Sequence, residues 1–201
     1  MIAIIDYGAG NIKSLQFALS KLNMESCLTT DPEKIKDSKA IILPGVGAFK
    51  DAIASLNQLG LSEVLKKEAA KGKPLIGICL GMQLFYERSF EDGKWEGLGL
   101  VKGNVRRIPD SVKVPHIGWN NISAHTNSPL LKNINNGAYV YFVHSYAVNK
   151  YQNNTLIAST EYGGSIPAIV QQDNIVGMQF HPEKSGAVGL QLLQNLKEMI
   201  S

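Results

Sequence analysis

Residues 74–84 read Pro74-Leu75-Ile76-Gly77-Ile78-Cys79-Leu80-Gly81-Met82-Gln83-Leu84, and this stretch decides how the rest of the chain is interpreted. Leucine and isoleucine fill both faces of its first half, which is typical of a parallel strand covered by helices. Glycines then flank Cys79 in the pattern G-x-C-x-G, the form of a tight strand-to-helix turn that presents a nucleophile. A cysteine there lies near a helix N-terminus, whose partial positive charge favours the thiolate. The alternative, a small buried cysteine in a glycine-rich turn, is commoner for a lone motif.

The first half of the chain alternates strand and helix patterns. Short apolar strands are expected at 2–5, 25–29, 40–43 and 75–78, with helical spacing between them. One helix is expected to bury Ala52, Ile53, Leu56 and Leu59, and the next is expected to begin at a cap provided by Ser62. Strands joined by crossover helices predict a parallel sheet, with functional loops at the carboxyl ends of its strands.

The second half changes to short strands separated by polar turns. The expected strands lie at 105–108, 139–148, 155–160, 168–171 and 175–180. The chain closes with a helix whose apolar stripe is Leu192, Leu193, Leu196, Met199 and Ile200. The predicted fold is therefore α/β, with a mostly parallel central sheet, helices on both faces, a flavodoxin-like core and an added antiparallel hairpin region. Because no linker or repeat interrupts the pattern, residues 1–201 are expected to form a single domain.

Composition narrows the class of protein. The 201 residues are enough for a core without disulfides or metals, and a net charge of +3 is too small to indicate nucleic-acid binding. Only Cys27 and Cys79 are present, which favours a reducing compartment. The N-terminus lacks the features of a signal peptide, and no apolar run is long enough to span a membrane. A cytoplasmic protein with no membrane partner is expected.

The sequence offers a base for the cysteine in His181-Pro182-Glu183, just after the strand expected at 175–180. The residue before a proline is held extended, and residues two apart in an extended segment point the same way. The His181 and Glu183 side chains can therefore lie within hydrogen-bonding reach, with Glu183 orienting the imidazole that takes the thiol proton from Cys79. For an isolated H-x-E, a strand end at His181 followed by a solvated Glu183 is the commoner interpretation. A metal site is disfavoured because these residues do not match a zinc spacing.

Acyl chemistry at Cys79 also needs donors for a developing oxyanion. The N–H of Leu80, directly after the cysteine, is one candidate. The second is expected from Val46 and Gly47 in the Pro44-Gly45-Val46-Gly47 turn, because glycines let a peptide plane rotate at little cost. Taken alone, that composition indicates only a loop.

Taken together, these motifs resemble the triad-type class I glutamine amidotransferases, and most specifically the glutaminase subunits of imidazole glycerol phosphate synthase. The resemblance rests on residues 77–83, 44–49 and 179–185, and also on 6–11, 114–120 and 141–146. The last three read Asp6-Tyr7-Gly8-Ala9-Gly10-Asn11, Val114-Pro115-His116-Ile117-Gly118-Trp119-Asn120 and Tyr141-Phe142-Val143-His144-Ser145-Tyr146. Because the matches appear in one order over nearly the whole chain, they are more specific together than singly.

The resemblance implies hydrolysis of glutamine to glutamate and ammonia through a thioester on Cys79. It implies that Gly45 and Gln83 help to hold the substrate and that the backbone at His144, Ser145 and Tyr146 binds its amino-acid end. It implies neither a cofactor nor a metal.

The resemblance also implies a partner, a (βα)8-barrel cyclase subunit that forms a heterodimer with this chain. That subunit would use the ammonia to make imidazole glycerol phosphate and an aminoimidazole carboxamide ribotide in histidine synthesis. Asn11, Trp119, Tyr141 and Lys184 match positions facing that partner. Core packing is the alternative for Trp119 and Tyr141. His116 and His125 are assigned no role.

Other functions are compatible with parts of the pattern. A related glutaminase could feed ammonia to another synthase, such as a sugar-amidating enzyme. A non-catalytic binding subunit is disfavoured by the intact Cys79, His181 and Glu183. A cysteine peptidase is disfavoured because Gln83 and the 44–47 turn suit a small amino-acid substrate.

Overall fold

The computed structural model describes residues 1–8 and 10–200. Ala9, in the expected turn at 6–11, and Ser201, the end of the expected domain, lie outside the described residues.

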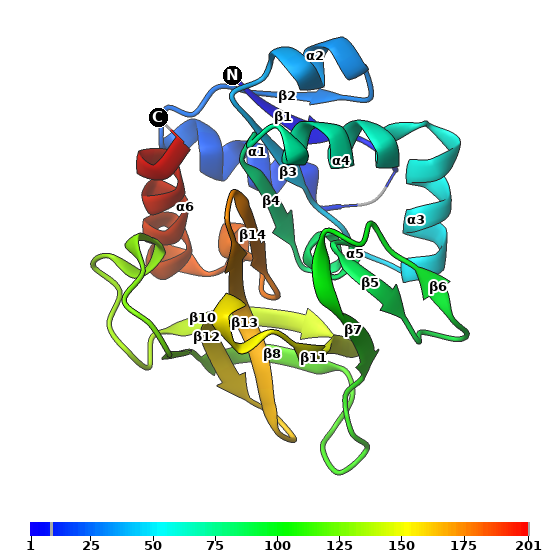
Figure 1. Ribbon diagram of the computed structural model, residues 1–201. Helices are drawn as coiled ribbons and strands as arrows, with labels where there is room; N and C mark the ends of the chain where they lie inside the picture. Colours follow the sequence, from blue (N-terminus) through cyan, green and yellow to red (C-terminus); the bar gives the residue numbers. More distant parts are fainter. Residues whose placement is uncertain (9, 201) are drawn as a thin grey trace.

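The centre of the fold is an eight-stranded sheet with the order β2-β1-β3-β4-β14-β13-β12-β9 (Figure 1). Its parallel strands are β2 (Ser26–Thr29), β1 (Ile2–Ile5), β3 (Ala40–Leu43), β4 (Leu75–Ile78) and β14 (Ile175–Met178). The first strand in the chain lies inside this group and the chain adds strands on either side of it, as in flavodoxin-like folds. The sequence-based prediction of the fold class is confirmed.

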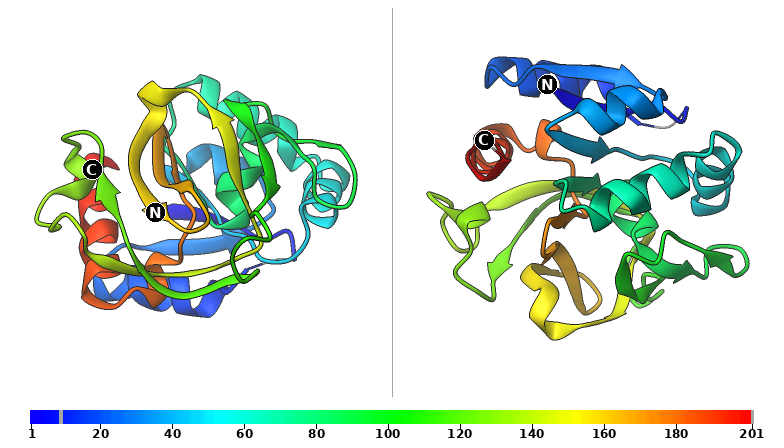
Figure 2. Two further views of the ribbon diagram at one scale, coloured as in Figure 1. Left: turned by 90° about the horizontal axis from the view of Figure 1, so that it is seen from below. Right: turned by 45° about the horizontal axis from the view of Figure 1, so that its top comes forward.

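Helices cover both faces of the parallel strands (Figures 1 and 2). One face is covered by α1 (Ile12–Lys21) and α6 (Gly186–Ile200), and the other by α2 (Pro32–Asp37), α3 (Phe49–Gln58) and α4 (Leu61–Ala70). Within β1, Ile2 and Ile4 pack toward the α1 side while Ala3 and Ile5 pack toward the α3 side. Alternate side chains thus enter separate hydrophobic cores, which is why these strands are apolar throughout.

The antiparallel part extends this sheet and adds two smaller ones. The large sheet continues through β13 (Ser165–Gln172), β12 (Leu156–Glu161) and β9 (Ser123–Ala124). A four-stranded sheet contains β11 (Tyr146–Tyr151), β7 (Val101–Arg107), β5 (Tyr86–Ser89) and β6 (Trp95–Glu96). A two-stranded ribbon pairs β8 (His116–Asn121) with β10 (Tyr139–His144). Short 3-10 helices are η1 (Pro129–Leu131), η2 (Asn153–Thr155) and η3 (Pro182–Lys184).

Several local predictions were wrong. Ser62 is not a cap, because α4 follows the left-handed Gly60 and the Ser62 hydroxyl instead donates to Asn57 Oδ1 at 2.5 Å. Leu59 follows the last turn of α3 and is 45% exposed, so it does not belong to the buried face of that helix. The segment 139–148 forms two strands in two sheets, since the chain changes partner at Ser145.

The topology places several loops together at one edge of the sheet. Strands β3, β4 and β14 are neighbours, and their carboxyl ends lead directly into the Pro44 turn, Cys79 and the Gln179–His181 segment. No helix in residues 1–8 and 10–200 combines the length and apolar character needed to cross a bilayer.

Candidate active site

Cys79 lies at the sharp turn between β4 and α5 (Leu80–Leu84), with φ 55° and ψ −112°. This left-handed conformation is unusual for a residue with a side chain and is typically kept where a site requires it. The turn depends on close approach of backbone to backbone, because a Cβ at Gly81 would overlap the carbonyl of Leu43. The side chain is 6% exposed, and its Sγ lies 3.7 Å from the Val143 carbonyl and 3.8 Å from Gln179 Nε2.

The His181 and Glu183 side chains meet as the extended geometry before Pro182 predicts. His181 Nδ1 and Glu183 Oε1 are 2.8 Å apart, and each side chain is 3% exposed. Because Glu183 engages Nδ1, Nε2 is the ring nitrogen left for proton exchange, and it is buried without a hydrogen-bond partner. Burial alone would lower the pKa of His181, but the neighbouring Cys79 and Glu183 raise it to about 9. At neutral pH the imidazolium is therefore the favoured form of His181.

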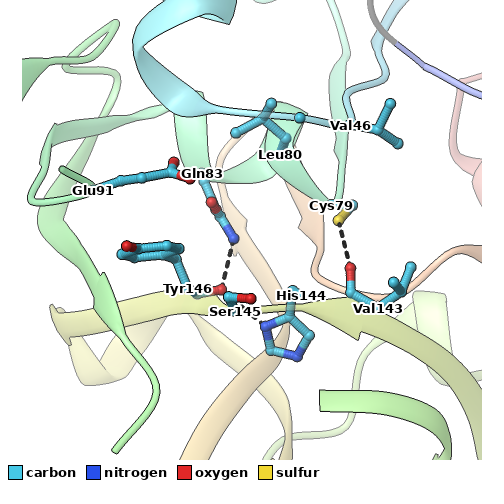
Figure 3. A pocket seen from close by; sticks show the side chains of 10 residues that line it. Val46, Cys79, Leu80, Gln83, Glu91, Val143, His144, Ser145 and Tyr146 are labelled. Atoms are coloured by element: carbon cyan, nitrogen blue, oxygen red, sulfur yellow. Dashed lines mark hydrogen bonds between the residues drawn. The ribbon is translucent and has the colours of Figure 1, made fainter. Parts of the chain in front are cut away.

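A cavity of about 220 Å³ opens beside Cys79 (Figure 3). This is smaller than the roughly 300–1,000 Å³ of sites for drug-sized ligands, so a small metabolite suits it better. Its lining residues are Val46, Gly47, Cys79, Leu80, Gln83, Glu91, Val143, His144, Ser145 and Tyr146. The 44–47 turn, the segment at Cys79 and residues 144–146 therefore surround one small space, whereas His181 and Glu183 are not among the residues that line it.

Gln83 presents a defined polar atom to this cavity. Its Nε2 donates to the Tyr146 carbonyl at 2.8 Å (Figure 3). The same Nε2 donates to Gln179 Oε1 at 3.0 Å. Because both amide hydrogens are used, the remaining polar atom, Oε1, can only accept a hydrogen bond. Gln83 therefore offers an acceptor to a ligand.

Glu91 is a cavity residue that the sequence interpretation missed. Its Oε2 accepts from the Phe49 N–H at 2.8 Å and so caps α3, whose own cap residue, Ala48, cannot do so. Burial raises the pKa of this carboxyl, although the bond from Phe49 opposes the shift. No local sequence signal marks Glu91, because it lies in a turn 42 residues from its partner Phe49.

Gln179 could have been found from the sequence. It lies two residues before His181 in an extended segment, so the alternation that pairs His181 with Glu183 also directs Gln179 to the same side. In the structure its amide contacts both Gln83 and Cys79.

The Pro44–Gly47 turn contributes Val46 and Gly47 to the cavity, and both are candidates for the second oxyanion donor beside Leu80. The buried hydroxyl of Tyr7 donates to the Pro44 carbonyl at 2.6 Å and holds the start of the turn. Gly45 packs behind the cavity instead, because a Cβ there would meet Tyr7 Oη, Gly81 N and Leu80 Cβ.

The residues expected at a partner surface lie outside the cavity. Trp119 is 55% exposed, so core packing does not explain it, and its ring contacts that of the half-buried Tyr141 edge-on at 6.0 Å. Lys184 is exposed in η3, and Asn11 precedes α1. The Tyr141 carbonyl accepts from the His181 N–H at 3.0 Å, which ties this surface to the histidine.

Within the described residues, no group of three or more His, Cys, Asp or Glu side chains is arranged to hold a metal ion.

Comparison with known protein families shows to which family this chain belongs. The profile of the family described as glutamine amidotransferase class-I matches residues 3–198. The chain belongs to the class-I glutamine amidotransferase family. This confirms the family resemblance that the motifs indicated.

The curated relatives of this class-I amidotransferase are similar over their full length. It is 62% identical to imidazole glycerol phosphate synthase subunit HisH of Oceanobacillus iheyensis, with 100% of both chains covered. It is 52% identical to the protein of the same name from Caldanaerobacter subterraneus subsp. tengcongensis, covering 100% of this chain and 98% of the relative.

Solved structures share its fold. A structure described as a glutamine amidotransferase superposes with a TM-score of 0.78 at 17% identity, covering 100% of this chain and 99% of that chain. PurLQS from Thermotoga maritima gives a TM-score of 0.79 at 21% identity, with 100% and 98% covered. At these identities the similarity shows the fold alone.

Proposed function

We propose that this chain is the glutamine-hydrolysing subunit of an imidazole glycerol phosphate synthase. The observation that carries the proposal is that Cys79, held in a left-handed turn, lines a small cavity and has as a neighbour the buried His181–Glu183 pair, whose histidine it influences electrostatically. Full-length similarity to proteins named HisH supports the choice of pathway. We further propose that residues 1–201 form one amidotransferase domain that acts in the cytoplasm, where its two free cysteines remain reduced.

In the proposed reaction the Cys79 thiolate attacks the side-chain amide carbon of glutamine. The N–H groups of Leu80 and of Val46 or Gly47 stabilise the oxyanion that develops. The His181 imidazolium then donates its proton to the departing ammonia, and a thioester remains on Cys79. Water, deprotonated by the now neutral His181, attacks the thioester carbon, and the C–S bond breaks to release glutamate and restore the Cys79 thiolate and the His181 imidazolium. Throughout, Glu183 stabilises the imidazolium and fixes its orientation.

The cavity supplies complementary groups for the amino-acid end of glutamine. Glu91 and the Oε1 of Gln83 are acceptors suited to the ammonium group. The backbone of His144, Ser145 and Tyr146 lines the same space and is proposed to hold the substrate. Gly45 acts indirectly, by letting the Pro44–Gly47 turn pack against Gly81.

The ammonia passes to a (βα)8-barrel cyclase subunit that binds this chain as a heterodimer. Asn11, Trp119, Tyr141 and Lys184 form the proposed contact surface, and neither nucleic acid nor a membrane takes part. Partner binding is proposed to rotate the Pro44–Gly47 turn and so complete the oxyanion hole. Glutamine hydrolysis should then be slow alone and faster with the liganded cyclase, and equal rates in both states would contradict the gating.

Trapping of the nucleophile tests the chemistry directly. A glutamine-analogue electrophile should add once to the wild-type chain at Cys79, as located by mass spectrometry, and not to Cys79→Ala. Glutamate release should be lost in the same variant. Cys27→Ala is the matched control because Cys27 lies on β2, away from the cavity, and it should behave as wild type. Labelling of Cys79→Ala would overturn the catalytic assignment.

Mixing with a cyclase subunit tests the pathway. With glutamine or with ammonium salt as nitrogen source, the pair should form imidazole glycerol phosphate. If only ammonia supported turnover while the chain still hydrolysed glutamine, the partner assignment would be wrong and the hydrolase assignment would stand.

A further inference from the structure

His116 has no place in the proposed chemistry, yet the fold encloses it closely. It is 3% exposed at the start of β8, and its ring stacks between two aromatic rings. The Phe142 ring centroid lies 4.7 Å away at an interplanar angle of 18°, and the Tyr162 centroid lies 3.8 Å away at 13°. This stacking holds the plane of the imidazole, so both ring nitrogens have fixed directions.

Hydrogen bonds lead from this ring to the cavity. His116 Nδ1 is 3.0 Å from His144 Nε2. His144 Nδ1 is in turn 2.8 Å from the Tyr146 carbonyl, and Figure 3 shows this second contact. On the other side, His116 Nε2 is 3.3 Å from Asn120 Nδ2. The Tyr146 carbonyl is the same atom that accepts from Gln83 Nε2.

Only one set of proton positions satisfies this chain of bonds when both rings are neutral. The Tyr146 carbonyl can only accept, so His144 carries its proton on Nδ1 and offers a lone pair on Nε2. His116 must then donate from its own Nδ1, which leaves Nε2 to accept from the Asn120 amide. Each of the two imidazole rings therefore donates from one nitrogen and accepts at the other.

Burial keeps both rings in the neutral state that this pattern needs. It lowers the pKa of His116 and of His144 to about 4 in each case. Protonation would place a hydrogen on every ring nitrogen and set two donors against each other between the rings.

We infer that His116 is a positioning residue for glutamine binding, which acts by fixing His144, the Tyr146 carbonyl and, through that carbonyl, the amide of Gln83. The inference rests on the proposed function only for the identity of the ligand. Without the donor from His116, the buried lone pair on His144 Nε2 loses its partner, and the His144 ring is held only by its own bond to the Tyr146 carbonyl. The Gln83 amide, which depends on the Tyr146 carbonyl for one of its two bonds and on Gln179 for the other, is then held less firmly with its oxygen toward the ammonium group of glutamine.

Nitrogen-15 NMR of the imidazole rings tests the proton arrangement without any assay of activity. At pH 7 both His116 and His144 should be Nδ1–H tautomers, whereas a free neutral imidazole favours the Nε2–H form. In His116→Phe, His144 should keep its Nδ1 proton, because the Tyr146 carbonyl still accepts from it, and the resonance of its unprotonated Nε2 should move downfield because that nitrogen has lost its donor. An Nε2–H tautomer at either position in the wild-type chain would overturn the inference.

Two substitutions separate positioning from packing. His116→Phe keeps an aromatic ring between Phe142 and Tyr162 but removes both hydrogen bonds. His116→Gln keeps a neutral donor and acceptor in a planar group. Removing a buried donor from a bonded pair changes affinity by about tenfold, so we expect His116→Phe to raise the KM for glutamine about tenfold and kcat to change less than about twofold. His116→Gln should stay within about threefold of wild type in both constants.

His125→Phe is the matched control, because the His125 ring contacts Ser159 Oγ at 2.7 Å and does not line the cavity. It should leave KM and kcat unchanged. Alkylation of Cys79 by iodoacetamide, which needs no glutamine site, should proceed at the wild-type rate in every variant. An unchanged KM in folded His116→Phe, or equal impairment of the Phe and Gln variants, would overturn the positioning role. Failure of the wild-type chain to hydrolyse glutamine would instead overturn the proposed function, and the NMR result would still decide the tautomers.

Discussion

Cys79 holds its backbone in a left-handed conformation that costs a residue with a Cβ about 1–3 kcal/mol. Such strain persists only where the surroundings impose it, and here β4, the close contact at Gly81 and α5 do so. The conformation directs the side chain out of the strand and toward the cavity. The G-x-C-x-G pattern predicted the turn, but it did not indicate that the cysteine itself would carry the positive φ.

The protonation of His181 can be tested by titration. Its pKa is raised from 6.5 to about 9, so the imidazolium is present at pH 7 and is lost as the pH rises through about 9. If the imidazolium donates to the departing ammonia, glutamine hydrolysis should fall above about pH 9. Heteronuclear NMR should place the His181 midpoint near 9 and leave His116 and His144 neutral above pH 6.

A variant identifies the cause of this shift. Cys79→Ala removes one of the two groups that raise the pKa of His181, while burial continues to lower it. The midpoint should therefore move to lower pH in this variant. A midpoint that stayed near 9 would mean that Glu183 alone sustains the imidazolium.

Glu91 can be tested with a substitution that keeps its structural bond. Glu91→Gln retains an oxygen to accept the Phe49 N–H and removes only the charge. Loss of a charge-assisted hydrogen bond costs about 1.5–3 kcal/mol, so KM for glutamine should rise about 10- to 100-fold. Steady-state kinetics measure this, and thermal unfolding should show a melting temperature close to wild type. An unchanged KM would remove Glu91 from the binding site.

At the scale of elements, the parallel core was predictable because each of its strands is an isolated apolar run between helical segments. The predicted bounds of strands β1 and β3 match the structure to the residue. Both faces of these strands are buried, so the run of apolar residues ends where the buried segment ends. The antiparallel half was less predictable. Strand β8 is half polar and contains Gly118, and residues 139–148 form one apolar pattern although two sheets share them.

The residues of the candidate site also differ in whether the sequence could predict them. Residues that follow strand ends, such as Cys79 and His181, could be found because the topology fixes where those ends meet. Glu91 and the inward-facing His116 could not, because their partners come from distant segments in the folded chain. Sequence spacing predicts contacts within an element and carries little information about such pairs.

The sharp turn between β4 and α5 at Cys79 gives a prediction about stability. Gly81→Ala would force its Cβ against the Leu43 backbone carbonyl, which cannot move without shifting β3. Overpacking of this kind costs about 1–3 kcal/mol and more where backbone is involved, so we expect a loss near 3 kcal/mol and no glutamine hydrolysis. Denaturant unfolding measures the first effect and glutamate release the second.

Gly72→Ala is the control for that substitution. Gly72 has φ 87°, and a Cβ added there would meet no atom within 4 Å, so the cost of the alanine is conformational only. A loss of about 1–2 kcal/mol with full activity is expected. If Gly81→Ala lost no more stability than Gly72→Ala, the turn at Cys79 would not depend on the close contact between the Gly81 and Leu43 backbones.

At the scale of the whole molecule, the β8–β10 ribbon separates two functions by strand alternation. Its inner face carries His116 and His144 toward the cavity, and its outer face carries Ile117 and Trp119, which are 58% and 55% exposed. Because the two sets alternate along one strand, displacement of the outer face on binding also moves the residues that hold the cavity. The ribbon is thus a direct structural link between the proposed partner surface and the proposed substrate site.

The outer face gives the last prediction, which concerns assembly. A central exposed aromatic residue at an interface commonly contributes about 2 kcal/mol, so Trp119→Ala should weaken binding of the cyclase subunit about 30-fold. Calorimetric titration measures that affinity, and glutamine hydrolysis by the uncomplexed chain should remain at its wild-type rate. Phe17→Ala is the matched control, since Phe17 is 63% exposed on α1 and is not among the proposed contact residues. Equal affinities for the Trp119→Ala chain and the wild-type chain would place the partner on another face of the molecule.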